Sequence, residues 1–202
     1  MAGADKGAIA RCAWVGNDPL MVAYHDHEWG QPVHDDQTLF EALILEGAQA
    51  GLSWSTVLKR RENYRRLFHN FDIQTVAAMT TEDQTRLLQD PGIIRNRLKV
   101  ASAIANAQAM LQIQREFGSL DRYFWAYVDH QPILNHYASQ EELPTQTDLS
   151  KAISRDLKKR GCRFVGPTIT YAFMQAVGMV NDHTIDCPWH PHHPSMTCPS
   201  GA

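Results

Sequence analysis

The chain has 202 residues, 44% of them hydrophobic and 20% charged, with a formal net charge of −3 at pH 7. This balance is typical of one soluble globular domain with a sizeable core, and no apolar run is long enough to span a membrane. Residues 1–11 lack the apolar segment of an export signal, so the four cysteines are expected to be reduced thiols or metal ligands in a cytoplasmic protein.

The stretch 12–29 combines a cysteine, two histidines and several aromatic residues, but it shows no clear helix or strand period. Together with two residues near the other end it makes a Cys2His2 set, which is the ligand chemistry of a closed structural zinc site: Cys12, His25, His183 and Cys187. The alternative is that His25 caps a turn and that the cysteines are ordinary buried thiols. Other residues compete as ligands, namely His27, His190, His192, His193 and Cys198.

From Asp35 onward the spacing of apolar residues predicts helices joined by short turns, and no useful β-alternation appears, so the fold class is all-α. Caps and breakers predict the boundaries. The expected helices are 36–51 after an Asp35 cap, 53–71, 73–79 after Asp72, 81–89 with a Thr81–Gln84 capping box, 96–117, 120–128 after Ser119, 147–160 before Gly161, and one opened by Pro167.

One domain is expected over residues 11–190, with a disordered N-terminal extension at 1–10 and a proline-rich disordered tail at 191–202. Disorder is expected to begin beyond Cys187. The polar, proline-containing segment 139–147 is expected to join helices rather than domains.

Charge is unevenly distributed along the chain. No lysine or arginine occurs between Arg11 and Lys59, where seven acidic residues lie, while most basic residues fall in the groups 59–66, 95–99 and 155–163. A polarised molecule of this kind can bind phosphates with one face despite its negative total charge. Ordinary solvated helix faces are the alternative interpretation of each basic group.

The stretch LLQDPGIIRNRLK predicts a helix, a short hairpin centred on Gly92 and a second helix that carries Arg95, Arg97 and Lys99. Gly92 would let the backbone approach a partner closely, and the second helix would turn its N-terminal amides toward an anion such as phosphate. Ile93 would hold the hairpin to the core. The alternative is a generic corner between two helices.

The stretch LEGAQAGLSW places Glu46 in apolar surroundings, eight residues before Trp54. Glu46 is therefore either a surface residue at a helix end or the recognition group of an aromatic pocket, to which Trp14 and Trp29 would also belong. Tryptophan is more often a core residue than part of a ligand pocket, so both interpretations stay open on these residues alone.

The motifs RCAWV, DPL, YHDHEWG, LEGAQAGLSW, KRRENYR, GIIRNRLK, KKRG, FVG and QAVGMVNDH occur in this order. Their combination closely resembles the type-I, constitutive bacterial class of 3-methyladenine DNA glycosylases, from about Arg11 to Cys187. The resemblance implies a helix-hairpin-helix glycosylase fold with its two ends joined by one structural zinc ion on Cys12, His25, His183 and Cys187. It also implies alkylated double-stranded DNA as substrate and free 3-methyladenine as product. The sequence carries no oligomer signal, so a monomer is the default expectation, and no membrane partner is expected.

The resemblance further implies the roles of single residues. Tyr24 and Trp54 would stack on the flipped base, and Glu46 would be the catalytic residue, hydrogen-bonding the base edge. Trp14 and Trp29 would wall the pocket, and Met21 stands where the family often has an aromatic residue. The residues expected to contact DNA are Gly51, Leu52, Gly92, Ile93, Ile94, Arg95, Arg97 and Lys99.

Two residues that related glycosylases use are absent from the corresponding positions of this sequence, and their absence fits the removal of 3-methyladenine. No acid lies between Pro91 and Arg115, where many relatives carry a catalytic aspartate, and Asn96 stands where bifunctional relatives have a nucleophilic lysine. Methylation at N3 gives adenine a positive charge and weakens the glycosidic bond, so a selective pocket matters more than a strong acid. Two rival functions are a zinc-stabilised DNA-binding module without catalysis, and a zinc hydrolase that uses residues 25–27.

Overall fold

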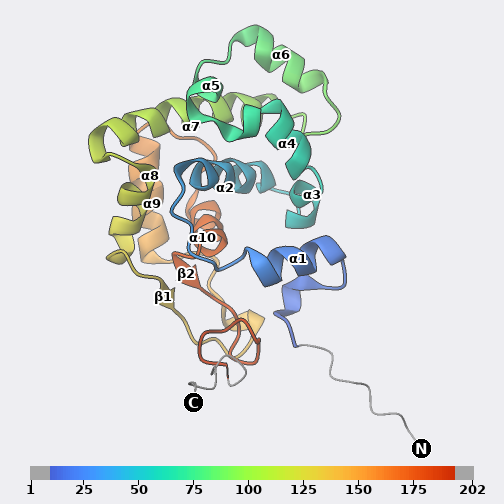
Figure 1. The fold of residues 1–202 in the computed structure, drawn as a ribbon, viewed down its shortest axis with the longest axis vertical. Helices are drawn as coiled ribbons and strands as arrows, with labels where there is room; N and C mark the ends of the chain where they lie inside the picture. Colours follow the sequence, from blue (N-terminus) through green and yellow to red (C-terminus); the bar gives the residue numbers. More distant parts are fainter. Residues whose placement is uncertain (1–9, 194–202) are drawn as a thin grey trace, which may run out of the picture.

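The structure, a computed structural model, describes residues 10–193, and these residues form a mostly helical fold (Figure 1). The α-helices are α1 (Pro19–His27), α2 (Asp36–Gln49), α3 (Trp54–Leu58), α4 (Arg61–Leu67), α5 (Ile73–Ala77), α6 (Thr81–Gln89), α7 (Arg97–Phe117), α8 (Leu120–Trp125), α9 (Asp148–Lys159) and α10 (Pro167–Ala176). Short 3-10 turns are η1 (Ala13–Val15), η2 (His69–Phe71), η3 (Ala126–Val128) and η4 (Gln140–Glu142).

Helix α2 lies at the centre and contacts α3, α7, α8 and α10 (Figure 1). Asp35 begins it as predicted, because the Asp35 carboxylate accepts a hydrogen bond from Thr38 N at 2.8 Å. Its residues Leu39, Phe40 and Leu43 are completely buried. Burial continues around the whole last turn, so Glu46 is carried into the interior with them.

The predicted helix-hairpin-helix is present as α6, the hairpin 90–96 and α7. Ile93 is 3% exposed and belongs to the main core, which confirms its expected role as the residue that holds the hairpin. The capping box before α6 lies one residue earlier than predicted, on Thr80 and Asp83, because the Asp83 carboxylate can accept from the Thr80 backbone N–H.

Three expectations about local structure were wrong. The stretch 12–29 contains a regular helix, α1, which begins at Pro19 after an Asp18 cap. The helix is short and has little apolar periodicity, so this Asp–Pro start signal was the main clue to it in the sequence. The expected helix 53–71 is broken at Lys59 and Arg60 into α3 and α4, and Asn70 then takes a left-handed conformation.

The third concerns strands: β1 (Ile133–Leu134) and β2 (Val180–Asn181) form a two-residue parallel pair. The pair is too short to leave an alternating pattern in the sequence. It holds the segment that follows η3 against the chain that leaves α10.

The chain from Trp29 to Val33 runs against the end of α10. Gly30 N donates to Gln175 O at 3.0 Å, and Val33 N donates to Val177 O at 3.1 Å. Gly178 has φ +70°, and a Cβ atom there would overlap the backbone of Gln31. Glycine therefore allows the N-terminal segment to reach the helix that lines the site described below.

The end of the described chain is ordered further than expected. Residues 188–193 form turns, and His190 is 1% exposed, with Nε2 3.1 Å from Asn135 O. The disorder predicted beyond Cys187 is therefore wrong for these six residues, and the rest of the predicted tail lies outside the described range. Within that range no helix is both long and apolar enough to cross a membrane.

Candidate functional site

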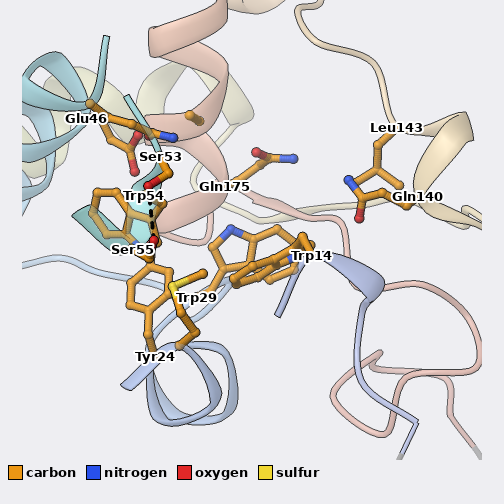
Figure 2. Close-up of a pocket in the computed structure, with 13 residues that line it drawn as sticks. Trp14, Tyr24, Trp29, Glu46, Ser53, Trp54, Ser55, Gln140, Leu143 and Gln175 are labelled. Carbon is orange, nitrogen blue, oxygen red and sulfur yellow. Dashed lines mark hydrogen bonds between the residues drawn. The ribbon is translucent and has the colours of Figure 1, made fainter. Parts of the chain in front are cut away.

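A cavity of about 400 Å³ opens between α1, α2, α3 and α10 (Figure 2). It contains all six residues that the sequence assigned to a base pocket. Its lining residues are Trp14, Met21, Tyr24, Trp29, Glu46, Gln49, Ser53, Trp54, Ser55, Gln140, Leu143, Ala172 and Gln175.

Four aromatic rings contribute to the walls, those of Trp14, Tyr24, Trp29 and Trp54. The ring centroids of Tyr24 and Trp54 lie 5.0 Å apart, and those of Trp14 and Trp29 also lie 5.0 Å apart, with an interplanar angle of 68°. Figure 2 shows Tyr24 and Trp54 on the Glu46 side of the cavity, with Trp14 and Trp29 across from them. The cavity thus presents electron-rich faces to a flat guest, and such faces attract cations.

Glu46 is 3% exposed, and its Oε2 atom has no hydrogen-bond partner among the described residues. Burial raises the pKa of its carboxyl group to about 8. At pH 7 the buried carboxyl therefore favours its neutral form. An approaching positive charge would favour the ionised form again.

Three other polar atoms in the cavity are buried and unpaired in the same way: Trp14 Nε1, Trp54 Nε1 and Gln140 Oε1. Buried polar atoms without partners are uncommon, since each costs about 1–3 kcal/mol. Two donors, one acceptor and a titratable acid in one cavity are the arrangement of a site that hydrogen-bonds its guest.

A smaller cavity of about 210 Å³ lies behind the same wall and shares Tyr24, Glu46 and Trp54 with the first. Two ion pairs line it, Arg61 with Glu28 and Arg65 with Glu41. They join α4 to α1 and α2, and so support the wall from outside.

The predicted metal ligands come together from the two ends of the chain. Cys12, His25, His183 and Cys187 are all buried, and their ligand atoms lie within 4.8 Å of one another. Sγ of Cys187 is 3.5 Å from both His25 Nε2 and His183 Nδ1. A tetrahedral zinc ion with bonds of about 2.3 Å to sulfur and 2.0–2.1 Å to nitrogen separates such atoms by about 3.5 Å.

Neighbouring groups orient both imidazoles for this purpose. His25 Nδ1 lies 2.8 Å from Asp26 Oδ1, and Asp26 in turn accepts from the Arg11 guanidinium. His183 Nε2 lies 3.2 Å from Trp29 O. These contacts leave His25 Nε2 and His183 Nδ1 facing the two sulfurs, the outer arrangement usual around metal-bound histidines.

The cluster contains no open position for a substrate, because four protein ligands complete a tetrahedron. This argues against the zinc hydrolase. Of the competing ligands, His27, His190, His192 and His193 lie outside the cluster, and Cys198 is outside the described residues.

The residues expected to contact DNA divide into two groups. Leu52 is 41% exposed, Gly51 adopts φ +77° in the same turn, and Arg95 and Arg97 are exposed. These four remain available to a partner. Ile93 is buried, and Ile94 is half-buried with its N–H donated to Tyr64 Oη at 3.1 Å.

Lys99 was expected to contact DNA, but its ammonium group binds within the protein. Lys99 Nζ donates to Ala48 O at 2.8 Å and to Ala50 O at 2.7 Å. It therefore neutralises the carbonyl end of α2 and holds the LEGAQAGLSW turn against α7. The sequence carries no signal that a lysine will lie close in space to the carbonyl end of a helix far away in the chain.

Gly92 is also explained by contacts within the chain. A Cβ atom would lie 2.7 Å from Asn63 Cγ, so crowding by α4 accounts for the glycine. The amides expected to face phosphate are partly occupied, since Asn96 Oδ1 accepts from both Leu98 N and Lys99 N. The exposed cationic side chains of the hairpin are those of Arg95 and Arg97.

Seven further residues line the cavity without having been predicted from the sequence: Gln49, Ser53, Ser55, Gln140, Leu143, Ala172 and Gln175. Gln49 and Ser53 lie within LEGAQAGLSW, where the motif itself could have pointed to them. Gln140 and Leu143 belong to the segment interpreted as a connection, and no local signal marks them as pocket residues.

These features define a class: a mainly helical protein with a helix-hairpin-helix and a cavity whose walls carry aromatic rings and a buried acid. A family model for methyladenine glycosylases matches residues 14–190. The chain is 54% identical over 183 residues to DNA-3-methyladenine glycosylase 1 of Escherichia coli (strain K12), covering 91% of this chain and 98% of that protein. It is 48% identical to DNA-3-methyladenine glycosylase of Haemophilus influenzae, covering 88% and 96%.

Solved structures agree. A crystal structure of 3-methyladenine DNA glycosylase I superposes with a TM-score of 0.88 at 53% identity, covering 90% of this chain and 100% of that one. The Staphylococcus aureus enzyme, described for its recognition of 3-methyladenine, gives 0.89 at 39% identity, covering 93% and 100%. The chain belongs to the methyladenine glycosylase family, type-I class, which confirms the resemblance found in its motifs.

The raised pKa of Glu46 leads to a prediction about stability and pH. Between about pH 4.5 and pH 8 the folded protein holds a proton that the unfolded chain releases, so this group's contribution to stability falls as pH rises through that window. We expect Glu46→Gln, which keeps the size and removes the titration, to gain stability relative to wild type from pH 5 to pH 9. Thermal unfolding of both proteins across this range measures it. Glu62→Gln, at an exposed site, should follow wild type, and parallel curves for Glu46→Gln would contradict the shift.

Proposed function

We propose that this protein removes 3-methyladenine from alkylated double-stranded DNA by hydrolysing the N-glycosyl bond, and that it leaves the DNA strand uncut. The observation that carries the proposal is the buried, unpartnered Glu46 carboxyl inside an aromatic pocket. A DNA-binding module without catalysis has no use for such a pocket, because burying an unpaired acid only costs stability.

The pocket residues act by selecting a charged ring. A base must leave the stack to enter, and a methylated base gives up less pairing when it does so. Its positive charge is attracted by the faces of Tyr24, Trp54 and Trp14, by about 0.5–2 kcal/mol for each contact. The same charge favours the Glu46 carboxylate, which then accepts hydrogen bonds from the ring's edge. Normal adenine has the amino group but lacks the charge, so the site discriminates against undamaged DNA.

Hydrolysis follows from this binding. A water molecule attacks C1′ of the sugar while the bond from C1′ to the base nitrogen breaks. The electron pair of the broken bond stays on the base and neutralises its positive charge. The products are an abasic site, neutral 3-methyladenine and a proton released to solvent. The enzyme lowers the barrier by binding the charged base in a site from which water is largely excluded. The carboxylate and the rings are held in place there before the base arrives. Asn96 serves as the cap of α7, and no lysine stands there to cut the strand.

Zinc would be held by the Cys12, His25, His183 and Cys187 cluster, where it would supply structural cross-linking only. The donor types, their separations and the oriented imidazoles all support this. His25 lies beside Tyr24 in α1, and His183 contacts the backbone of Trp29. The cluster thus anchors the part of the pocket wall that comes from the N-terminal segment.

The sharpest test is Glu46→Gln, assayed by single-turnover release of 3-methyladenine from alkylated DNA. The variant keeps shape and one acceptor but cannot become negative when the cation arrives. We expect excision to slow by about ten- to a hundred-fold, the scale of a hydrogen bond to a charged group. Glu62→Gln, which removes an exposed carboxylate, should excise normally. Wild-type rates from folded Glu46→Gln protein would remove Glu46 from the mechanism.

The metal proposal is tested by Cys187→Ala. Because the binding energy of a structural metal is also folding energy, this variant should lose zinc and melting temperature together. Cys162→Ala is the matched control. Cys162 is a buried thiol outside the cluster, and burial raises its pKa to about 12. It should lose a little stability and keep its zinc. One tightly bound zinc in both Cys12→Ala and Cys187→Ala would refute the assignment.

The DNA-facing side is tested by the double variant Arg95→Gln/Arg97→Gln on undamaged duplex DNA. Each arginine–phosphate ion pair that the variant loses should reduce the steepness of log affinity against log salt concentration by about 0.9. Arg115→Gln/Arg122→Gln removes the same charge at the other end of α7, near Gly118, and should leave the slope unchanged. Equal slopes for wild type and the hairpin variant would show that neither arginine meets DNA.

A further inference from the structure

Helix α10 presents Gln175 to the cavity from the side opposite α1 (Figure 2). Its side-chain Nε2 donates a hydrogen bond to Asp182 Oδ2 at 2.7 Å, and its Oε1 has no hydrogen bond to another described residue. The sequence analysis gave Gln175 no role. It lies at the boundary between the guest cavity and a buried carboxylate.

Asp182 is completely buried and is a hub of hydrogen bonds. Its Oδ2 accepts from Tyr171 Oη at 2.6 Å as well as from Gln175, and its Oδ1 accepts from Asn135 Nδ2 at 2.7 Å. Both oxygens therefore act as acceptors. The strand pair β1–β2 fixes one of these partners relative to the hub, since Asn135 follows β1 and Asp182 follows β2.

This hub decides which way the Gln175 amide points. Turning the amide over would place Oε1 against Asp182 Oδ2, so two acceptors would face each other without a proton between them in a buried position. The amide is consequently held with its N–H on Asp182 and its oxygen away from it. Figure 2 shows that oxygen on the side of the amide nearer Glu46. The cavity thus has a hydrogen-bond acceptor of fixed direction.

A fixed acceptor distinguishes purines in a way that Glu46 cannot. Adenine carries an amino group, a donor, where guanine carries the oxygen O6, an acceptor. The Glu46 carboxylate that a cationic guest favours is also an acceptor, but burial raises its pKa to about 8, so this carboxyl can take up a proton and then donate. An amide oxygen locked by Asp182 accepts only. It favours the amino group and leaves an unsatisfied pair of acceptors when the oxo group takes its place.

We propose that Gln175 is a specificity-determining residue, positioned by Asp182, whose amide oxygen accepts an N–H of the exocyclic amine of methylated adenine and disfavours methylated guanine. The proposal rests on the proposed function of the pocket. The amino group lies on the six-membered ring, away from the nitrogen joined to the sugar. A base that enters with its sugar at the mouth therefore brings this group inside, where Gln175 lines the cavity.

The experiment measures the ratio of 3-methyladenine to 3-methylguanine released in single turnovers from one preparation of methylated DNA. Gln175→Met keeps the length of the side chain and removes the acceptor, so the ratio should fall about ten-fold, the effect of one hydrogen bond at a buried site. Gln114→Met is the matched control, because Gln114 Nε2 also donates to a carboxylate, Asp36, at 2.6 Å but lies outside the pocket. Its ratio should equal that of wild type.

A second variant tests the positioning. Asp182→Asn places a donor opposite the amide, which allows Gln175 to turn over and present its N–H to the guest. The ratio should then fall at least as far as in Gln175→Met, and the double variant should fall no further than Gln175→Met alone. Because Asp182 adjoins His183, melting curves and metal content are measured in parallel, and Gln175→Met tests the proposal by itself.

The outcomes are distinct. If both release rates fall together in Gln175→Met and the ratio stays within about two-fold of wild type, the residue is structural and the inference is overturned. An unchanged ratio in folded Asp182→Asn overturns the positioning role of Asp182. If wild type releases neither base, the proposed function fails, and this result is separate from either failure at Gln175.

Discussion

The structure depends on one unfavourable placement, the burial of an acid without a protein partner. Glu46 stands in the last turn of the central helix, where its neighbours on both sides are core residues. Burial raises the pKa of its carboxyl to about 8, which favours the protonated form at neutral pH. Such a group persists only when the surrounding packing supports it, and here α2 is covered on several sides by α3, α7, α8 and α10.

The rest of the pocket can be understood from that constraint. A neutral acid between aromatic rings has little attraction for an uncharged base, but it gains a partner whenever a cation arrives. The aromatic walls of the pocket come from segments that are distant in the chain. The Cys–His cluster holds the N-terminal segment through His25, which follows Tyr24, and through the backbone of Trp29. Ion pairs behind the wall and Lys99 on the carbonyls of α2 hold the opposite side.

Much of this was predictable because the signals were local or carried by motifs. Asp35, Asp72 and Ser119 cap helices as expected, and Pro167 opens α10. The six residues assigned to a base pocket line one cavity, and the four metal-ligand candidates lie together. Helix α1 and the two-residue strands were missed because elements so short leave almost no period in a sequence.

The sequence by itself determined the mainly helical class and the family, because caps, apolar spacing and ordered motifs depend on neighbouring residues. It also named the aromatic residues and the Cys2His2 set that the structure brings together. Only the tertiary structure decided the electrostatic state of these groups. The pKa of Glu46 follows from the burial of its whole surroundings, and Lys99 is diverted from a partner by helix-end carbonyls some fifty residues earlier. The direction of the Gln175 amide depends on Asp182, Tyr171 and Asn135 meeting at one point. Burial and convergent hydrogen bonds are properties of packing, so no stretch of sequence contains them.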